Sequence, residues 1–176
     1  QPLFDAGFLW QGQTKTKSHH IKTGFQRLDN ILVSGGWPTR CVIEILTNNP
    51  VHLPTQIILP SWRLLSENKH NWLGLINPPY QPCTEGWMQK VINTSKIDII
   101  SVNENLFVWC TEQFCQSNTT TSVLAWAPEK INFSQLRRLQ LACQKYTTQL
   151  FLVRPIEYEN NPSPASLRLK LLQKNQ

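Results

Sequence analysis

Apolar and polar positions follow a repeated order along this chain, with short apolar runs separated by longer amphipathic segments. Runs of six or seven residues rich in apolar side chains are typical of strands that are buried on both faces. Five such runs occur, at residues 41–46, 71–77, 96–102, 122–127 and 149–155. Because helical segments separate them, the pattern predicts an α/β domain with a mostly parallel central sheet of five or six strands and helices on both faces.

The clearest helix is predicted over residues 132–146. Asn132 can accept a hydrogen bond from the backbone at the first turn, and Gln135 stands three residues later, which is the order of a capping box. The apolar positions then recur at helical spacing on one face, at Leu136, Leu139, Cys143 and Tyr146.

Four further segments have helical character. A helix is expected within 53–68 that starts late or is interrupted, because Pro60 would have to lie in its first turn. A short helix is expected over 84–94. The other two carry their apolar faces at Phe25, Leu28 and Leu32, with Thr23 or Gly24 near the cap, and at Phe107, Cys110 and Phe114.

The two ends of the chain differ from its centre. Residues 1–22 are polar and lack a clear period, so we expect a weakly ordered N-terminal segment followed by a single domain over 23–176. In the C-terminal tail, Leu alternates with Arg or Lys at 167–171, which favours an edge strand, with a tail helix as the alternative.

The charge of the chain favours an ordinary basic surface. Its 17 Lys and Arg residues exceed its 11 Asp and Glu residues, for a net charge of +6, but the basic residues form no block. An acidic partner is compatible with this balance, whereas nucleic acid is an unlikely partner.

The cysteines and histidines indicate neither a disulfide framework nor a metal site. The five cysteines are odd in number and include no CxxC pair, so we expect reduced thiols in a cytoplasmic protein, with Cys41, Cys110 and Cys143 buried. The four histidines have no partner at metal-ligand spacing. No apolar run approaches the roughly 18 residues of a membrane helix.

The junction after the first apolar run, residues 47–55, has the position of a phosphate-binding loop but lacks its chemistry. Such a loop needs glycines, a lysine and a hydroxyl at the start of the helix. Here Pro50 and Pro54 each remove an N–H donor, and Val51 resists a positive φ. Only Thr55 could supply the hydroxyl at the start of the helix.

The acidic residues of a nucleotide hydrolase are also missing. A magnesium-binding carboxylate is expected at the end of a later strand, where this chain has Ala125, Trp126 and Ala127. The segment 76–80, where a catalytic carboxylate would follow the second strand, contains none. We therefore expect no catalysis, no cofactor and no metal, with a weak ATPase or a DNA-binding protein as a remaining alternative.

The order of several segments resembles the SulA/ImuA family of RecA-like proteins. Residues 23–46 resemble the entry to a RecA-type core, and the other matching pieces are LINPPYQP, EGWMQKVIN, KIDIISV, LRRLQLA and NPSPASLRL. The resemblance covers nearly everything from Thr23 to Leu171. It implies a RecA-like three-layer fold with a degenerate P-loop.

The family has two functions. SulA proteins are SOS-induced inhibitors of cell division that bind FtsZ and stop its polymerisation, and ImuA proteins are SOS-induced accessories of an error-prone translesion polymerase. The short chain and the lost phosphate site favour SulA, whereas LWQG and NPSPASLRL favour ImuA. The resemblance also implies a homodimer and turnover by an ATP-dependent protease.

The resemblance implies a partner-binding surface as well. The region from the second strand to the third is the part tied to inhibition in SulA proteins. The corresponding positions are Trp72, Ile76, Trp87 and Lys96, with Lys90 beside Trp87 on the short helix. An Arg expected next to the first tryptophan is Asn71 here. Core packing is the alternative for both tryptophans, because most of seven tryptophans must be partly buried.

Overall fold

The computed structural model describes residues 10–11, 20–68, 70–80 and 93–173 of the chain. Six parallel strands form the central sheet, and a short antiparallel strand extends it at one edge. In spatial order the strands are β1 (Trp10–Gln11), β9 (Leu167–Leu171), β4 (Val42–Thr47), β8 (Gln149–Pro155), β7 (Thr120–Trp126), β5 (Trp72–Ile76) and β6 (Ile97–Ile100). The predicted α/β class and mostly parallel sheet are confirmed.

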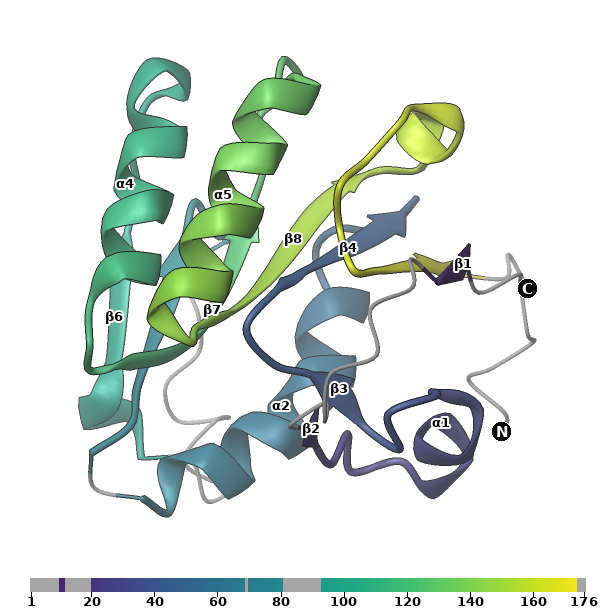
Figure 1. Cartoon of the computed structure of the whole chain (residues 1–176), viewed down its shortest axis with the longest axis vertical. Coiled ribbons are helices and arrows are strands. Elements are labelled where there is room, and N and C mark those ends of the chain that lie inside the picture. The colour runs from purple at the N-terminus through teal and green to yellow at the C-terminus, as the bar shows by residue number, and fades with distance from the viewer. Residues whose placement is uncertain (1–9, 12–19, 69, 81–92, 174–176) are drawn as a thin grey trace.

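Helices cover both faces of this sheet (Figure 1). Helices α4 (Glu104–Gln116) and α5 (Phe133–Tyr146) lie side by side on one face, and α2 (Leu53–Ser66) lies on the other. The remaining elements of the described residues are helix α1 (Gln26–Ile31), the antiparallel pair of β2 (His20–Ile21) and β3 (Trp37–Pro38), and the 3-10 helices η1 (Thr94–Lys96) and η2 (Ile156–Asn160). The described helices are too short or too polar to cross a membrane.

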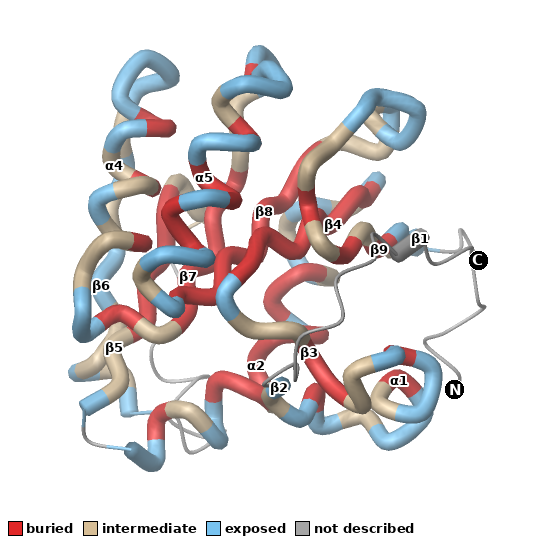
Figure 2. Tube along the Cα trace, viewed as in Figure 1, coloured by how far each residue is buried: buried red, intermediate tan, exposed pale blue. Residues whose placement is uncertain are grey.

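The core consists of two layers, one on each face of the sheet (Figure 2). On the α2 side, the fully buried Trp37 packs edge-on against Phe151 with ring centroids 5.2 Å apart. Trp62 is also fully buried there, and its indole N–H donates to Ser122 Oγ at 2.9 Å. This bond satisfies a polar group that would otherwise be costly to bury.

Helix α5 forms as its sequence predicts. Asn132 Oδ1 accepts from the backbone N–H of Gln135, and the Gln135 side chain accepts from the N–H of Asn132, both at 2.9 Å. Leu139 and Cys143 are completely buried on its inner face, whereas Tyr146 is only half-buried.

The predicted apolar face of α4 is partly wrong. Phe107 is completely buried, but Cys110 and Phe114 are half-buried. The buried positions are Phe107, Val108, Thr111 and Cys115. Helix α4 packs against both the sheet and α5. Its buried face is therefore rotated about the helix axis from the face that Phe107, Cys110 and Phe114 predicted.

Pro60 lies in the interior of α2, which corrects the expected position in a first turn. The helix already begins at Leu53, because Pro54 occupies its first turn, where a missing N–H costs nothing. Pro60 cannot donate to the carbonyl of Gln56, and its ring instead packs against Gly24. A Cβ on Gly24 would lie 2.4 Å from Cβ of Pro60.

The C-terminal tail forms strand β9, so the strand prediction is confirmed and the alternative helix is wrong. It is not the outermost strand, because β9 pairs in parallel with β4 and antiparallel with β1. Within the segment expected to be weakly ordered, residues 10–11 and 20–21 form strands. Most of the helix expected over 84–94 lies outside the described residues, and Thr94 belongs to η1.

We predict that Gly24→Ala destabilises the protein more than Gly35→Ala does. Both glycines have a positive φ, +86° and +71°, which costs an L residue about 1–2 kcal/mol. Only Gly24 also faces a rigid ring at 2.4 Å, and overpacking adds about 1–3 kcal/mol. The free energies of unfolding, measured by urea titration, should differ by at least about 1 kcal/mol. Equal losses would show that the contact with Pro60 is not tight.

Candidate functional site

The loop between β4 and α2 is closed by its own side chains. Asn49 Oδ1 accepts from the backbone N–H groups of Val51 and His52, at 3.2 and 3.3 Å. The N–H of Asn49 itself donates to Thr47 Oγ1 at 3.0 Å. In a phosphate-binding loop, N–H groups at the start of the helix point at the anion. Here a carboxamide oxygen of the same chain accepts from the N–H groups of the two residues just before the helix.

The residue at the end of β7 ties this loop to the sheet. The indole N–H of Trp126 donates to the carbonyl of Pro50 at 2.8 Å. A nucleotide hydrolase would carry a magnesium-binding carboxylate near this position. In this chain the position holds a largely buried indole that fixes the loop against the strand end.

The hydroxyl at the start of α2 is also engaged. Thr55 is buried, and its Oγ1 lies 3.2 Å from the hydroxyl of Tyr80. The Tyr80 ring is tilted against His52, with centroids 6.1 Å apart. Thr55 therefore joins α2 to the segment that follows β5.

Asn77 occupies the end of β5, near the position expected for a catalytic carboxylate. It has a φ of 51°, a left-handed conformation that Asn tolerates better than most residues. Its side chain donates to the carbonyl of Val102 at 3.0 Å and accepts from the N–H of Val102 at 2.7 Å. The amide thus joins the ends of β5 and β6, a role that the sequence pattern did not indicate.

The carboxylate at the centre of the sheet, Glu44, is fully committed to ion pairs. Glu44 is completely buried on β4, with Oε1 2.6 Å from Arg154 Nη1 and Oε2 2.6 Å from Arg168 Nε. Arg168 also donates to the carbonyls of Tyr158 and Glu159, both at 2.9 Å. The arrangement connects β4, β8, β9 and η2. A carboxylate with both oxygens paired in this way is suited to holding structure, not to acting as a base.

The acidic residue inside the apolar run over 41–46 was a usable signal for this network. Glu44 interrupts the run over 41–46, and a charge in a strand buried on both faces requires a partner. Its two partners lie 110 and 124 residues away along the chain, so the sequence did not identify them.

The sites predicted for partner binding have different surroundings. Trp72 is half-buried at the start of β5, and Lys96 Nζ lies 4.6 Å from the centroid of its ring, within cation–π range. Ile76 is 0% exposed and packs in the core between the sheet and α4 and α5, so its side chain offers no surface to a partner. Trp87 and Lys90 lie outside the described residues.

Asn71, where the resemblance suggests an Arg, has a local structural role. Its side chain donates to the carbonyl of Leu65 at 3.0 Å and accepts from Thr121 Oγ1 at 2.9 Å. It therefore joins the end of α2 to the β5–β7 pair.

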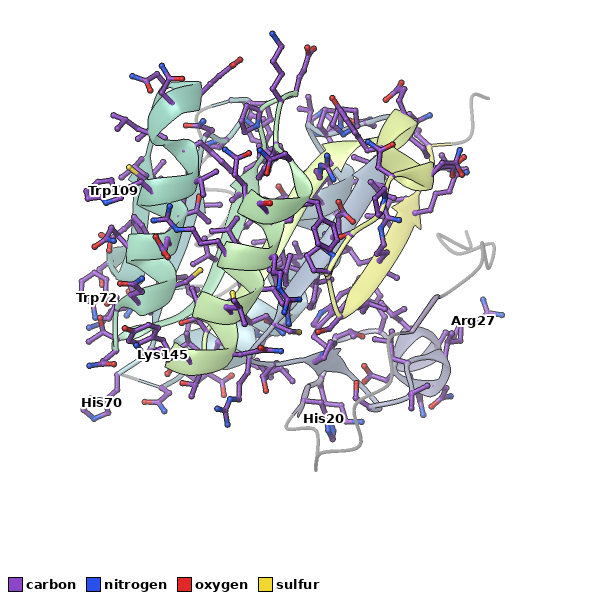
Figure 3. All side chains as sticks on the ribbon, turned by 45° about the horizontal axis from the view of Figure 1, so that its top comes forward. His20, Arg27, His70, Trp72, Trp109 and Lys145 are labelled. Carbon is purple, nitrogen blue, oxygen red and sulfur yellow. The ribbon has the colours of Figure 1, made fainter. Side chains whose placement is uncertain are left out.

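An exposed tryptophan that the sequence analysis did not single out lies on the same side of the molecule. Trp109 on α4 is 53% exposed, and it lies along the outer edge that also carries Trp72 (Figure 3). A large aromatic side chain left in water is a common anchor in protein interfaces. Trp109 stands between Val108 and Cys110 in an apolar stretch, so the sequence pattern did not mark it as exposed.

The described cysteines are free thiols, as the sequence predicted. Cys41 and Cys143 are buried as expected, Cys110 is half-buried, and Cys115 is buried as well. Burial raises the pKa of the Cys41 thiol to about 12, and a hydrogen bond with Ser166 partly opposes this. Among the described residues, no group of three or more His, Cys, Asp or Glu side chains could hold a metal ion.

Comparison with solved structures identifies the fold of this chain. No protein-family model and no curated protein sequence matches this chain. A solved structure does, the crystal structure of SulA from Pseudomonas aeruginosa, with 21% sequence identity and a TM-score of 0.51. The match covers 64% of this chain and 97% of that one. The chain therefore has a SulA-like fold.

We predict that Glu44→Gln destabilises the protein by about 3 kcal/mol, because it leaves two arginines without their carboxylate in a buried site. Glu159→Gln is the matched control. Glu159 pairs with Lys170 at the surface, so its loss should cost less than about 1 kcal/mol. Urea unfolding monitored by tryptophan fluorescence measures both values. Similar losses would show that the buried network contributes no more than a surface pair.

Proposed function

We propose that this protein is an SOS-response inhibitor of cell division that binds FtsZ and blocks its polymerisation without catalysis. The closed loop at the end of β4 is the observation that carries the proposal. The carboxamide of Asn49 accepts from the loop N–H groups, and the hydroxyl of Tyr80 contacts Thr55 Oγ1, so the groups that would bind a phosphate and its magnesium ion already have partners. The SulA-like fold supports an inhibitor of this type.

The proposed mechanism requires only a rigid surface. An inhibitor that caps or sequesters the subunits of a polymer needs a few anchors that remain in place without the partner, which lowers the cost of binding. The cation–π contact holds Lys96 over Trp72 and thereby provides two such anchors at the β5–β6 edge of the sheet. We propose Trp72 and Lys96 as partner contacts, together with Trp87 and Lys90.

Two finer features belong to the same proposal. A homodimer and degradation by an ATP-dependent protease are what the family resemblance implies. Both fit a transient inhibitor, whose action has to end once DNA repair is complete.

A second candidate function is an accessory role in an error-prone polymerase complex, as in ImuA proteins. The observation in its favour is that about a third of this chain lies outside the match to SulA. The tail resembling ImuA is also an integral part of the fold, because Leu167 and Leu169 of β9 are buried in the core.

We predict that excess purified protein abolishes the sedimentation of FtsZ polymers formed with GTP. FtsZ without the protein, and FtsZ with heat-unfolded protein, are the controls. Undiminished polymer at a several-fold excess would contradict the division-inhibitor function. Binding to a translesion polymerase partner in a pull-down would then favour the second candidate.

We predict that Lys96→Ala weakens this inhibition about ten-fold, because one interface anchor typically contributes about 1–2 kcal/mol. Lys145→Ala is the matched control. Lys145 also lies over an aromatic ring, that of Tyr146 at 4.9 Å, but at the end of α5. The concentration for half-inhibition of FtsZ sedimentation should rise for the first variant alone. Equal effects in the two variants would place the contact elsewhere.

A further inference from the structure

Two buried thiols face each other between the helices of one layer. Cys115 lies in the last turn of α4 and Cys143 in the last turn of α5, and both are 0% exposed. The Cys143 thiol donates to Cys115 Sγ across 3.7 Å. The two sulfur atoms are thus in contact without a bond. A disulfide requires about 2.05 Å between the two sulfur atoms, so the two side chains would have to move closer together.

We propose that Cys115 and Cys143 form an oxidation site, at which a two-electron oxidant such as a peroxide produces an intramolecular disulfide between α4 and α5. One thiol, as thiolate, attacks a peroxide oxygen and becomes a sulfenic acid as water leaves. The second thiol then attacks that sulfur, the S–S bond forms and a second water leaves. The two thiols are oxidised to one disulfide, and one hydrogen peroxide is reduced to two waters.

The two thiols are buried, but each lies near a helix end, where local opening can expose it to an oxidant. Cys115 is followed by one more helical residue and then the turn 117–119, in which Asn118 is exposed. The last turn of α5 ends at Thr147, which is exposed and has a φ of 66°. Helix ends open locally at a far smaller free-energy cost than the whole protein. Each opening exposes one thiol while its partner remains near.

The surroundings of the pair keep it reduced between openings and limit its choice of partner. The hydrogen bond to Cys115 and burial raise the pKa of the Cys143 thiol well above its ordinary value, so this thiol stays protonated and unreactive while it is buried. The hydroxyl of Thr148 lies 2.8 Å from the carbonyl of Cys115 and holds the end of α4 against β8. Cys41, the other buried thiol nearby, donates to the carbonyl of Pro38.

The site is independent of the proposed function, because it requires no partner protein. Its consequence is structural: a covalent link between two helices that pack side by side on one face of the sheet (Figure 1). Such a link restricts the unfolded chain and raises thermal stability.

The test uses the full chain, reduced, desalted and treated with hydrogen peroxide under native conditions. The intact mass of the monomer should fall by two hydrogens, and digestion without reductant should yield one linked peptide pair containing Cys115 and Cys143. The melting temperature should rise by about 5–10 °C and return after reduction. An unchanged mass, a linkage to any other cysteine, or a disulfide that forms only in denaturant would overturn the proposal.

Cysteine variants test whether the disulfide joins Cys115 and Cys143. Cys143→Ser should lose the linked pair, whereas Cys110→Ser, a change at the half-buried cysteine of the same helix, should retain it. If Cys143→Ser does not fold, a chain with Cys41, Cys83 and Cys110 all changed to Ser retains only the two thiols of interest. That chain should form the disulfide at a rate within about two-fold of the original. A failure of this folded chain to lose two hydrogens would equally refute the site.

Discussion

The buried carboxylate of Glu44 imposes a constraint on the centre of the sheet. It stands on a strand whose two faces are both covered, so its charge is tolerable only with paired hydrogen-bond donors. Arg154 and Arg168 supply them from the two neighbouring strands, and Arg168 extends to the carbonyls of η2. The strand order β9–β4–β8 therefore places the carboxylate of Glu44 between the guanidinium groups of Arg154 and Arg168. A tail in any other position would leave the carboxylate with one partner.

The need to pair polar groups also explains why the end of β4 is closed. A loop with free N–H groups at a helix start attracts anions, and in this chain Asn49 accepts two of those groups. The indole of Trp126 and the amide of Asn77 then bind backbone groups of neighbouring segments. These contacts hold the strand ends and the loop together through hydrogen bonds within the chain. A function carried by the outer surface, as proposed here, is compatible with such a closed sheet end.

Particular elements show where sequence reasoning succeeded and where it failed. Helix α5 was predictable down to its capping box, because its cap and its period are local properties. Pro60 was misplaced, because α2 already begins at Leu53, and Pro60 lies against a glycine 36 residues earlier in the chain. Ile76 was expected at a binding surface, yet the packing of α4 and α5 buries it completely. Residues such as Trp87 stay predictions, because they lie outside the described part of the chain.

By itself, the sequence determined the α/β class and the mostly parallel sheet, and it favoured a strand over a helix in the tail. Each of these follows from the period of apolar residues or from residue types within a few positions of one another. Only the tertiary structure decided the partners of Glu44, the contact of Cys115 with Cys143 and the pairing of Lys96 with Trp72. The physical reason is that the chemistry of a charge, a thiol or a ring defines which type of partner it requires. Which distant residue lies beside it depends on how the chain packs in three dimensions.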